Sequence, residues 1–393
     1  MIVVIADDLT GAGEIGGIGL AYGLKAELQR QFWSESNADL LIIDTDTRSF
    51  SPDKAKRVIK DAVRYLYESN LPIEWIYKKT DSVLRGPVAG ELNALREVMN
   101  VARILLVPVN PSKARIVRNG HYLINGTPLS ETDFANDPEY PASTSNVLEL
   151  PALCGSGQIH LLKNDQTLFD EGILIGQAET TDDLLRWAER MDAQTVMAGT
   201  GEFFEAILSN KGFSRKVAAD KKDYRLGNKA LFVCGSSSDS SRQALKKAES
   251  LGMSVCKMPE KLFMSDCSGS PFLQQWSNEI IRCFKTNRSV IVAIDHEVVG
   301  NAALSGKLRR LMAKMVLTIC RKIPLKELFI EGGATASQIV GRLGWNRFEP
   351  CEQLGLGVVR MKVLESDNTY LTVKPGSYPW PKSIWKKDIF EAS

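Results

Sequence analysis

The sequence predicts an α/β fold of two domains, each built on a mostly parallel sheet flanked by helices. Short apolar runs rich in Val and Ile alternate with helical segments, which is typical of parallel βαβ units. The 393 residues are more than one ordinary hydrophobic core accommodates. A stretch rich in Lys and Arg, residues 211–229, lies between two such series and is interpreted as a solvated linker. We therefore expect a first domain over residues 1–222 and a second over residues 223–393.

The composition excludes several classes of protein. A net charge of +2, from 49 basic and 47 acidic residues, gives no electrostatic reason to expect nucleic acid or a membrane surface as a partner. No apolar run approaches the ~18 residues that a membrane helix needs, and the sequence opens on a strand and aspartates rather than on an export signal. The seven cysteines include no C-x-x-C pair, which argues against a disulfide framework or a zinc site. These features predict a cytoplasmic protein.

The first strand and the turn after it carry the most informative residues. Residues 2–6 predict a strand buried on both faces, and Asp7, Asp8 and Thr10 follow it before a glycine-rich helix. Residues 11–16 also spell G-x-G-x-x-G, the dinucleotide-binding pattern. A carboxylate ~4 Å from a phosphate charge costs on the order of 4 kcal/mol at an effective dielectric of about 20. This turn therefore repels a pyrophosphate unless a metal intervenes, and it suits a hydroxyl group, Mg²⁺ or a proton to be abstracted.

The glycines of this helix have a second explanation. Gly16, Gly19 and Gly23 fall on one face at spacings of three and four, and each is unfavourable in a helix interior. Close packing of the helix on the sheet accounts for them as well as a nucleotide does.

Three further strands are expected to end in polar turns. Residues 38–43 lead into Asp44–Ser49, residues 73–77 into Lys78–Gly86, and residues 103–107 into Pro108–Arg115. Parallel βαβ winding brings the carboxyl ends of such strands to one edge of the sheet. The four turns together supply acid, hydroxyl and guanidinium groups to one crevice, as a small, polar, anionic ligand requires.

The chain then leaves the predicted sheet. Asn119-Gly120 and Asn125-Gly126 are hairpin-type turns, so residues 115–128 are expected to form a β excursion. Together with the polar loop that runs to Pro141, this excursion is suited to serve as a lid. Residues 158–162 and 194–198 predict two more strands, the second leading into a helix.

The second domain is expected to repeat the α/β pattern with a different chemistry. Strands are predicted at residues 230–234, 289–294 and 328–331, a helix at 301–322 and a terminal β segment at 354–374. Glycine and hydroxyl residues, with scarcely any acid, follow the first and third of these strands. Backbone N–H groups and hydroxyls at helix starts suit phosphates, although neither turn has the spacing or the Lys of a Walker A loop.

Six segments occur in the order seen in one known enzyme family. They are residues 6–12 (ADDLTGA), 44–48 (DTDTR), 79–86 (KTDSVLRG), 119–129 with its two Asn-Gly pairs, 235–238 (GSSS) and 332–336 (GGATA). On these segments the chain resembles the four-carbon acid sugar kinases, a family formerly known as a domain of unknown function. The resemblance covers nearly the whole chain. It implies an N-terminal domain that binds a tetronate-type acid sugar, a C-terminal domain that binds ATP, and an active site in the interdomain cleft.

The resemblance implies phosphorylation of the terminal 4-hydroxyl of erythronate, threonate or a 3-oxo-tetronate, with ATP and Mg²⁺ as cofactors. Together with the chemistry of the turns, it points to particular residues. The candidate catalytic residues are Asp8 and Asp81. The candidate substrate-binding residues are Asp7, Thr10, Arg48, Lys79, Ser82 and Arg85. The candidate nucleotide-binding residues are Ser236, Ser238, Gly332, Gly333, Ala334, Thr335 and Gly376.

The chain departs from the family's pattern in four places. Ala334 stands where the family usually has an acid, and Lys374-Pro375-Gly376 stands where it usually has Lys-Ser-Gly. Pro87 replaces a usual Asn and Ser130 a usual His. The first two departures bear on nucleotide contacts, and the last two bear on the identity of the sugar.

Phosphoryl transfer needs alignment, a metal on the phosphates and a group that receives the hydroxyl proton. Asp8 or Asp81 is the candidate base. We expect Arg85, with Arg48, to pair bidentately with the carboxylate of the substrate.

Two alternatives stay open. One is an NAD-dependent sugar-acid dehydrogenase built on Gly11, Gly13 and Gly16, and the other is a non-catalytic acid-sugar-binding protein. The expected partner is a small-molecule acid sugar, with neither nucleic acid nor a membrane, and a homodimer is an open arrangement.

Overall fold

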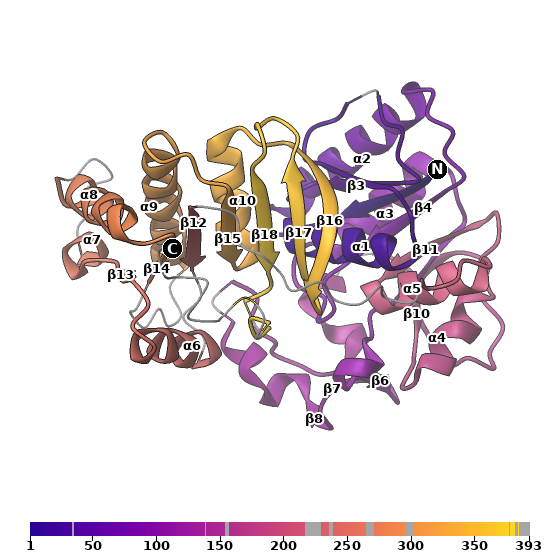
Figure 1. Ribbon diagram of the computed structural model, residues 1–393. Helices are drawn as coiled ribbons and strands as arrows, with labels where there is room; N and C mark the ends of the chain where they lie inside the picture. Colours follow the sequence, from indigo (N-terminus) through magenta and orange to yellow (C-terminus); the bar gives the residue numbers. More distant parts are fainter. Residues whose placement is uncertain are drawn as a thin grey trace. The chain divides into compact units, whose positions relative to one another are not determined.

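The computed structural model of the chain contains two compact units, Met1–Val217 and Ala218–Ser393 (Figure 1). It describes residues 1–33, 35–137, 139–153, 157–216, 229–235, 239–264, 271–294, 302–376, 378–381 and 384. The boundary expected between residues 222 and 223 lies outside these described residues. Each unit contains mostly parallel strands flanked by helices, so the predicted α/β class is confirmed.

The strands of the first unit's main sheet are all parallel. Their order is β2 (Ala26–Gln29), β3 (Leu40–Asp44), β1 (Ile2–Ala6), β4 (Trp75–Lys79), β11 (Thr195–Gly199), β5 (Arg103–Val107), β10 (Gly172–Gly176) and β9 (Ile159–Leu162). Strand β1 is buried along its whole length between β3 and β4. A strand covered on both faces is a nearly continuous apolar run, which is why the sequence predicts β1 and β3 correctly.

Two strands of this unit are not predicted by the sequence. Strand β2 has the sequence AELQ, and its polar Glu27 and Gln29 hide the apolar pattern. Strand β10 has the sequence GILIG, a short run whose flanking glycines are more typical of turns. Both strands are formed because the neighbouring strands offer unpaired backbone groups, which no local pattern reveals.

Helices cover both faces of the first unit's sheet. They are α1 (Leu9–Ala21), α2 (Pro52–Glu68), α3 (Val88–Met99), α4 (Thr181–Ala188) and α5 (Gly201–Asn210). Helix α2 packs on α3, whereas α1 and α4 pack on α5. Right-handed crossovers between parallel strands place these two groups on opposite faces.

The glycine face of helix α1 is explained in part by packing. A Cβ on Gly19 would lie 2.6 Å from a methyl carbon of Leu40 in β3, so the helix can approach the sheet only with glycine there. The same interpretation is wrong for Gly23, which follows the end of the helix at Ala21 and has a φ of +73°. Gly23 forms the turn that directs the chain into β2.

A small antiparallel sheet follows β5, as the Asn-Gly pairs predict. It contains β6 (Arg115–Arg118), β7 (His121–Ile124) and β8 (Thr127–Pro128). Asn119, Gly120, Asn125 and Gly126 all have positive φ, as hairpin turns of this type require. Short 3₁₀ turns continue from Leu129–Glu131 to Pro151–Leu153.

The second unit has parallel strands followed by an antiparallel hairpin. The order is β13 (Val255–Lys257), β14 (Ser289–Ala293), β12 (Ala230–Cys234), β15 (Glu327–Glu331), β18 (Tyr370–Lys374), β17 (Val358–Val363) and β16 (Arg347–Gly355), with β17 antiparallel to both of its neighbours. Its helices are α6 (Asp239–Ser250), α7 (Glu260–Met264), α8 (Pro271–Thr286), α9 (Ala302–Cys320) and α10 (Gly333–Leu343). In the core, Phe232 stacks on Phe329 with 4.3 Å between ring centroids.

Each unit has a point where the winding of its strands reverses. In the first unit the chain leaves β1 toward β2 and β3 and leaves β4 toward β5, although β1 and β4 are neighbours. In the second unit the neighbours β12 and β15 have the same relation. Ligands of open α/β sheets bind at the carboxyl ends of the strands at such a point. Asp7 and Thr80 follow one pair of strand ends, and Gly235 and Gly332 follow the other.

None of the helices in the described part of the chain combines the length and the apolar character needed to cross a membrane.

Candidate active site

Asp8 lies two residues after the first strand and caps helix α1. Its Oδ1 accepts a hydrogen bond from the backbone N–H of Gly11 at 2.9 Å, and its Oδ2 accepts one from the hydroxyl of Thr10 at 2.5 Å. A Cβ on Gly11 would lie 2.8 Å from Asp8 Oδ1 and 3.2 Å from Lys79 Nζ. The first glycine of the G-x-G-x-x-G pattern is therefore required by these side chains and needs no pyrophosphate to explain it.

Arg48 lies between three carboxylates. Its Nε and Nη2 donate to Asp7 at 2.7 and 3.1 Å, and its Nη1 and Nη2 donate to Asp8 at 2.9 and 2.8 Å. The third carboxylate belongs to Asp81, whose Oδ1 is 3.8 Å from Arg48 Nη1. We call Asp7, Asp8, Arg48 and Asp81 the aspartate cluster. All three of its aspartates are buried.

Within the aspartate cluster, the opposite charges keep both Arg48 and Asp7 ionised by shifting their pKa values. Burial opposes the charge on Arg48, but Asp7, Asp8 and Asp81 outweigh it and hold the pKa of the guanidinium well above its usual value. Burial likewise acts to raise the pKa of Asp7, and Arg48 with Lys78 lowers it below its usual value. Asp7 is therefore ionised at neutral pH and remains so in mildly acidic solution.

Asp81 organises the loop that follows β4. Its Oδ2 accepts hydrogen bonds from the backbone N–H groups of Val83 and Arg85 at 3.3 and 3.2 Å. The Arg85 guanidinium donates to the two oxygens of Asp81 at 2.9 Å each, and its Nη1 donates to Asp137 at 3.2 Å. Burial opposes ionisation of Asp81, but Arg85 and Arg48 hold the pKa of its carboxyl well below the usual range.

Lys79 and Ser82 lie beside the aspartate cluster. Lys79 is 4% exposed, donates to the carbonyl of Thr80 at 2.9 Å and lies 3.4 Å from Glu14. Burial acts to raise the pKa of Glu14, and Lys79 and Lys113 lower it below its usual value. Ser82 accepts a hydrogen bond from Arg115 Nη1 at 2.7 Å. The structure thus brings together Asp7, Asp8, Thr10, Arg48, Lys79, Asp81, Ser82 and Arg85, all of which the sequence had suggested for one site.

Asp44, at the end of β3, and Asp46, in the turn after it, do not take part in this site. Asp44 and Asp46 pair with Arg30 at 3.0 and 3.1 Å, so they stabilise the turn after β3 rather than face a ligand. Burial raises the pKa of Asp44 to about 7, although Arg30 opposes this shift. Of that turn only Arg48 reaches the aspartate cluster.

The polar loop after the excursion adds residues that the sequence analysis did not single out. The ring of Phe134 lies beside two guanidinium groups. Its centroid is 5.7 Å from Cζ of Arg85 and 5.4 Å from Cζ of Arg115. Asp137 pairs with Arg85. The local sequence offers no signal for these contacts, because they depend on how the polar loop folds back over the strand ends.

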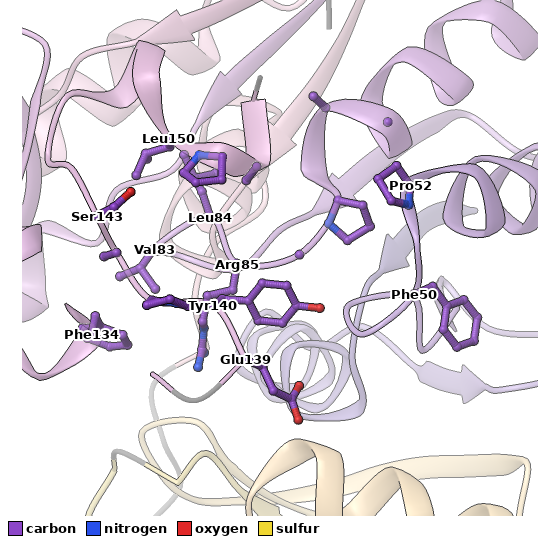
Figure 2. A pocket seen from close by; sticks show the side chains of 18 residues that line it. Phe50, Pro52, Val83, Leu84, Arg85, Phe134, Glu139, Tyr140, Ser143 and Leu150 are labelled. Carbon is purple, nitrogen blue, oxygen red and sulfur yellow. The ribbon is translucent and has the colours of Figure 1, made fainter. Parts of the chain in front are cut away.

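A cavity of about 440 Å³ adjoins this region (Figure 2). Its walls are largely apolar and are formed by the loop after β4, the start of α2 and the segment that returns from the excursion. Residues labelled in Figure 2 include Phe50, Pro52, Val83, Leu84, Phe134, Tyr140 and Leu150. Arg85 also lines it, and the hydroxyl of Tyr140 donates to the carbonyl of Arg48. These walls are too apolar to recognise a small polyhydroxy acid, which the aspartate cluster suits better.

The second unit presents a helix start without a side-chain cap. Gly332 precedes helix α10, has a φ of +93° and makes no side-chain cap hydrogen bond. The first N–H groups of a helix have no partner within it, so those of Gly333, Ala334 and Thr335 suit an anion. A Cβ on Gly235 would lie 2.6 Å from the hydroxyl oxygen of Thr335. Gly235 therefore lies against the first turn of α10, at the switch point of this unit.

The remaining nucleotide candidates are Ser236, Ser238 and Gly376. Ser236 and Ser238 lie outside the described residues. Gly376 belongs to the segment after β18, where the buried Lys374 donates to the carbonyls of Pro375 and Gly376 at 2.9 and 3.4 Å. Lys374 Nζ also pairs with Glu331 at 2.8 Å, and Glu331 accepts a hydrogen bond from Ser241. Glu331 ends strand β15, so this ion pair ties the terminal segment to the glycine turn.

These features define a class of protein with an aspartate–arginine site in one α/β unit and, in the other, an uncapped helix start that suits an anion. Comparison with known proteins agrees with this division. Residues 2–206 match the family model of a sugar-binding N-terminal domain, and residues 231–378 match that of a nucleotide-binding C-terminal domain. The chain belongs to the family in which these two domains are joined.

Curated relatives of the chain are sugar acid kinases. The chain is 25% identical over 373 residues to the D-threonate kinase of Salmonella typhimurium, covering 87% of this chain and 86% of the relative. It is 28% identical to the D-erythronate kinase of Heliobacterium modesticaldum, over 63% of this chain and 60% of the relative. It is 23% identical to the 3-oxo-tetronate kinase of Actinobacillus succinogenes, over 100% of this chain and 98% of the relative.

Two solved structures share the fold. A Haemophilus influenzae protein with a domain of unknown function matches with a TM-score of 0.68 at 18% identity, over 97% of this chain and 98% of its own. A Salmonella typhimurium protein described as a putative tRNA synthase matches with a TM-score of 0.76 at 17% identity, over 98% of both chains.

The resemblance seen in the motifs is thereby confirmed, and the chain is an enzyme of the kinase class. The kinase class excludes the dehydrogenase alternative, and the contacts of Gly11 with Asp8 and Lys79 explain the first glycine of its pattern.

Proposed function

We propose that the chain transfers a phosphoryl group from ATP to the terminal 4-hydroxyl of a four-carbon sugar acid such as threonate, erythronate or a 3-oxo-tetronate. The observation that carries this proposal is the aspartate cluster at the switch point of the first unit. Its carboxylates accept hydrogen bonds from hydroxyl groups, and the neighbouring guanidinium groups attract a carboxylate. The kinase relatives support a sugar acid as substrate, and they differ in which four-carbon acid they use.

Asp8 is the proposed base. Its Oδ2 accepts hydrogen bonds from two side chains, Thr10 and Arg48, and a substrate hydroxyl can replace that of Thr10. Oδ2 of Asp81 instead accepts from two backbone N–H groups and the Arg85 guanidinium. A carboxylate engaged in this way, with a pKa well below the usual range, is a poor proton acceptor. We therefore assign Asp81 the role of holding Arg85 and the loop in place.

The second unit is the proposed site of ATP. The N–H groups of Gly333, Ala334 and Thr335 would donate hydrogen bonds to phosphate oxygens. Gly332 and Gly235 have no side chains that would block the approach of the phosphates to the start of α10. Lys374 neutralises Glu331, so the buried carboxylate next to this turn does not repel phosphate. When bound, ATP supplies the phosphoryl group and Mg²⁺ neutralises its developing charge.

A protein cage for the metal is not required. Across the described ranges no three His, Cys, Asp or Glu side chains are grouped to hold a metal ion. Magnesium in phosphoryl-transfer enzymes is bound chiefly by phosphate oxygens and water, with one or two carboxylates.

The proposed function is tested by a coupled assay of ADP release with a panel of four-carbon acids. We expect turnover of at least one tetronate or oxo-tetronate, dependent on both ATP and Mg²⁺. A panel of five- and six-carbon acids serves as the comparison. Thermal stabilisation by a tetronate without any turnover would contradict the proposal and favour the non-catalytic acid-sugar-binding alternative.

Substitution of Gly235 by Ala is expected to raise the KM for ATP at least tenfold and to leave the KM for the sugar acid within about twofold. The added methyl carbon would lie 2.6 Å from the hydroxyl oxygen of Thr335, in the first turn of α10, so the two groups would overlap. Steady-state kinetics with each substrate varied in turn provide the measurement. Gly306→Ala is the matched control, because its Cβ has no contact closer than 3.4 Å and the site is helical. An unchanged KM for ATP in Gly235→Ala would remove this turn from the nucleotide site.

A further inference from the structure

The proposed substrate carries a carboxylate, and the site must supply a cation to recognise it. Arg48 and Arg85 are the obvious candidates in the sequence. In the structure, both of them are paired with aspartate carboxylates of the protein itself. Arg48 makes four hydrogen bonds to Asp7 and Asp8, and Arg85 makes two to Asp81 and one to Asp137. To bind a substrate carboxylate, either arginine would have to leave a buried aspartate without its partner, which is strongly unfavourable.

Arg115 differs from these two arginines. It begins strand β6, and its Nη1 donates to the hydroxyl of Ser82 at 2.7 Å. Within the described ranges, no carboxylate lies within ion-pair distance of its guanidinium. A guanidinium has five N–H donors, so Arg115 retains a planar edge that fits a carboxylate bidentately.

The surroundings of Arg115 hold this group toward the site. Its backbone N–H donates to the carbonyl of Asn110 at 3.1 Å, and its carbonyl accepts from the N–H of Asn110 at 2.8 Å. Its guanidinium lies over Phe134, the ring that Arg85 also contacts. Ser82 is the neighbour of Asp81 in the chain, so Arg115 borders the aspartate cluster. It adds a positive charge there that no aspartate of the cluster balances.

We propose that Arg115 is the residue that recognises the carboxylate of the substrate, and that it determines the preference for a sugar acid over the corresponding neutral polyol. Arg48 and Arg85 then act as counterions that keep the aspartates in place for the hydroxyl groups. This inference rests on the proposed function and makes it more specific. It assigns a role to the first residue of the excursion, which neither the motifs nor the family comparison singled out.

The test compares Arg115→Gln and Arg115→Lys with the wild type in the coupled assay. The substrates are a four-carbon sugar acid and the polyol with the same hydroxyls, for example threonate and threitol. We expect Arg115→Gln to lower kcat/KM for the acid by roughly tenfold to a hundredfold, as the loss of a charge-assisted hydrogen bond implies. Activity on the polyol and the KM for ATP should remain within about twofold. Arg115→Lys keeps the charge and should recover part of the preference for the acid.

Arg118→Gln is the matched control, because Arg118 lies on the same strand, is exposed and pairs with Glu179. It should leave the ratio of acid to polyol unchanged. An unaltered ratio in Arg115→Gln would overturn the assignment of Arg115 while the kinase activity of the wild type upholds the proposed function.

A binding experiment decides the question separately from turnover. Calorimetric titration of the wild type with threonate, erythronate and 3-oxo-tetronate, without nucleotide, should show binding of at least one acid that Arg115→Gln loses and Arg118→Gln retains. If the wild type binds an acid but phosphorylates none, the proposed function fails. Loss of that binding in Arg115→Gln would still support the role of Arg115. Equal binding by wild type and Arg115→Gln, or no binding by the wild type, would overturn the inference.

Discussion

Asp8→Asn is expected to lower kcat by a factor of about 10²–10⁴, the usual contribution of a positioned general base. Asparagine has nearly the same shape as aspartate, and its oxygen can still accept the N–H of Gly11 that caps helix α1. Arg48 keeps both of its hydrogen bonds to Asp7. The fold should therefore persist, and the KM for ATP should change little. Steady-state kinetics and a thermal unfolding curve of the same preparation provide the measurement.

The matched control for this prediction is Asp46→Asn. Asp46 also follows a strand of the first unit and pairs with an arginine, but its side chain is 44% exposed and its partner is Arg30. It should have nearly wild-type kcat. A kcat for Asp8→Asn within about threefold of the wild type would exclude Asp8 as the base and make Asp81 the next candidate.

The sequence predicted the strands that end in polar turns because those strands are buried on both faces. Such runs have almost no polar residue, as β1 and β3 illustrate, and parallel pairing then brings their ends together. This pattern places Asp7, Asp8 and Asp81 at one edge of the sheet, and the family resemblance is what set Asp8 and Asp81 apart from Asp44 and Asp46. Strands β2 and β10 do not follow from this pattern, because their short and mixed sequences depend on neighbours for backbone pairing.

The pairing of the arginines could not be predicted. Arg48, Arg85 and Arg115 all follow strands of the same sheet, and nothing in the pattern of strands and turns shows which of them pairs with an aspartate of the chain. Their partners depend on distances of a few ångströms between separate turns. Arg48 meets Asp7 and Asp8 because β1 and β3 pair in register, whereas Arg115 meets Ser82 because the start of the excursion lies against the loop after β4.

Lys374→Met is expected to have the largest effect on stability. Lys374 and Glu331 are each 1% exposed and form an ion pair at 2.8 Å. Removing one partner of a buried pair typically costs about 3–5 kcal/mol, because the other charge is left buried without compensation. Lys374 Nζ also donates to carbonyls of the segment that carries Gly376, so this segment should lose order as well. The KM for ATP should therefore rise along with the loss of stability.

Urea unfolding followed by tryptophan fluorescence measures this effect, since Trp380 lies beside the pair, with its ring 5.5 Å from Lys374 Nζ. The double variant Lys374→Met/Glu331→Gln should recover part of the loss, because it leaves no uncompensated charge. Lys257→Met is the matched control, because its pair with Glu249 is exposed and such pairs contribute only about 0–1 kcal/mol. A loss below about 1 kcal/mol in Lys374→Met, or a double variant as unstable as the sum of the single ones, would show that the buried charges do not depend on each other. In that case the terminal segment would be held chiefly by the apolar contacts of Trp380 with Phe232 and Phe329.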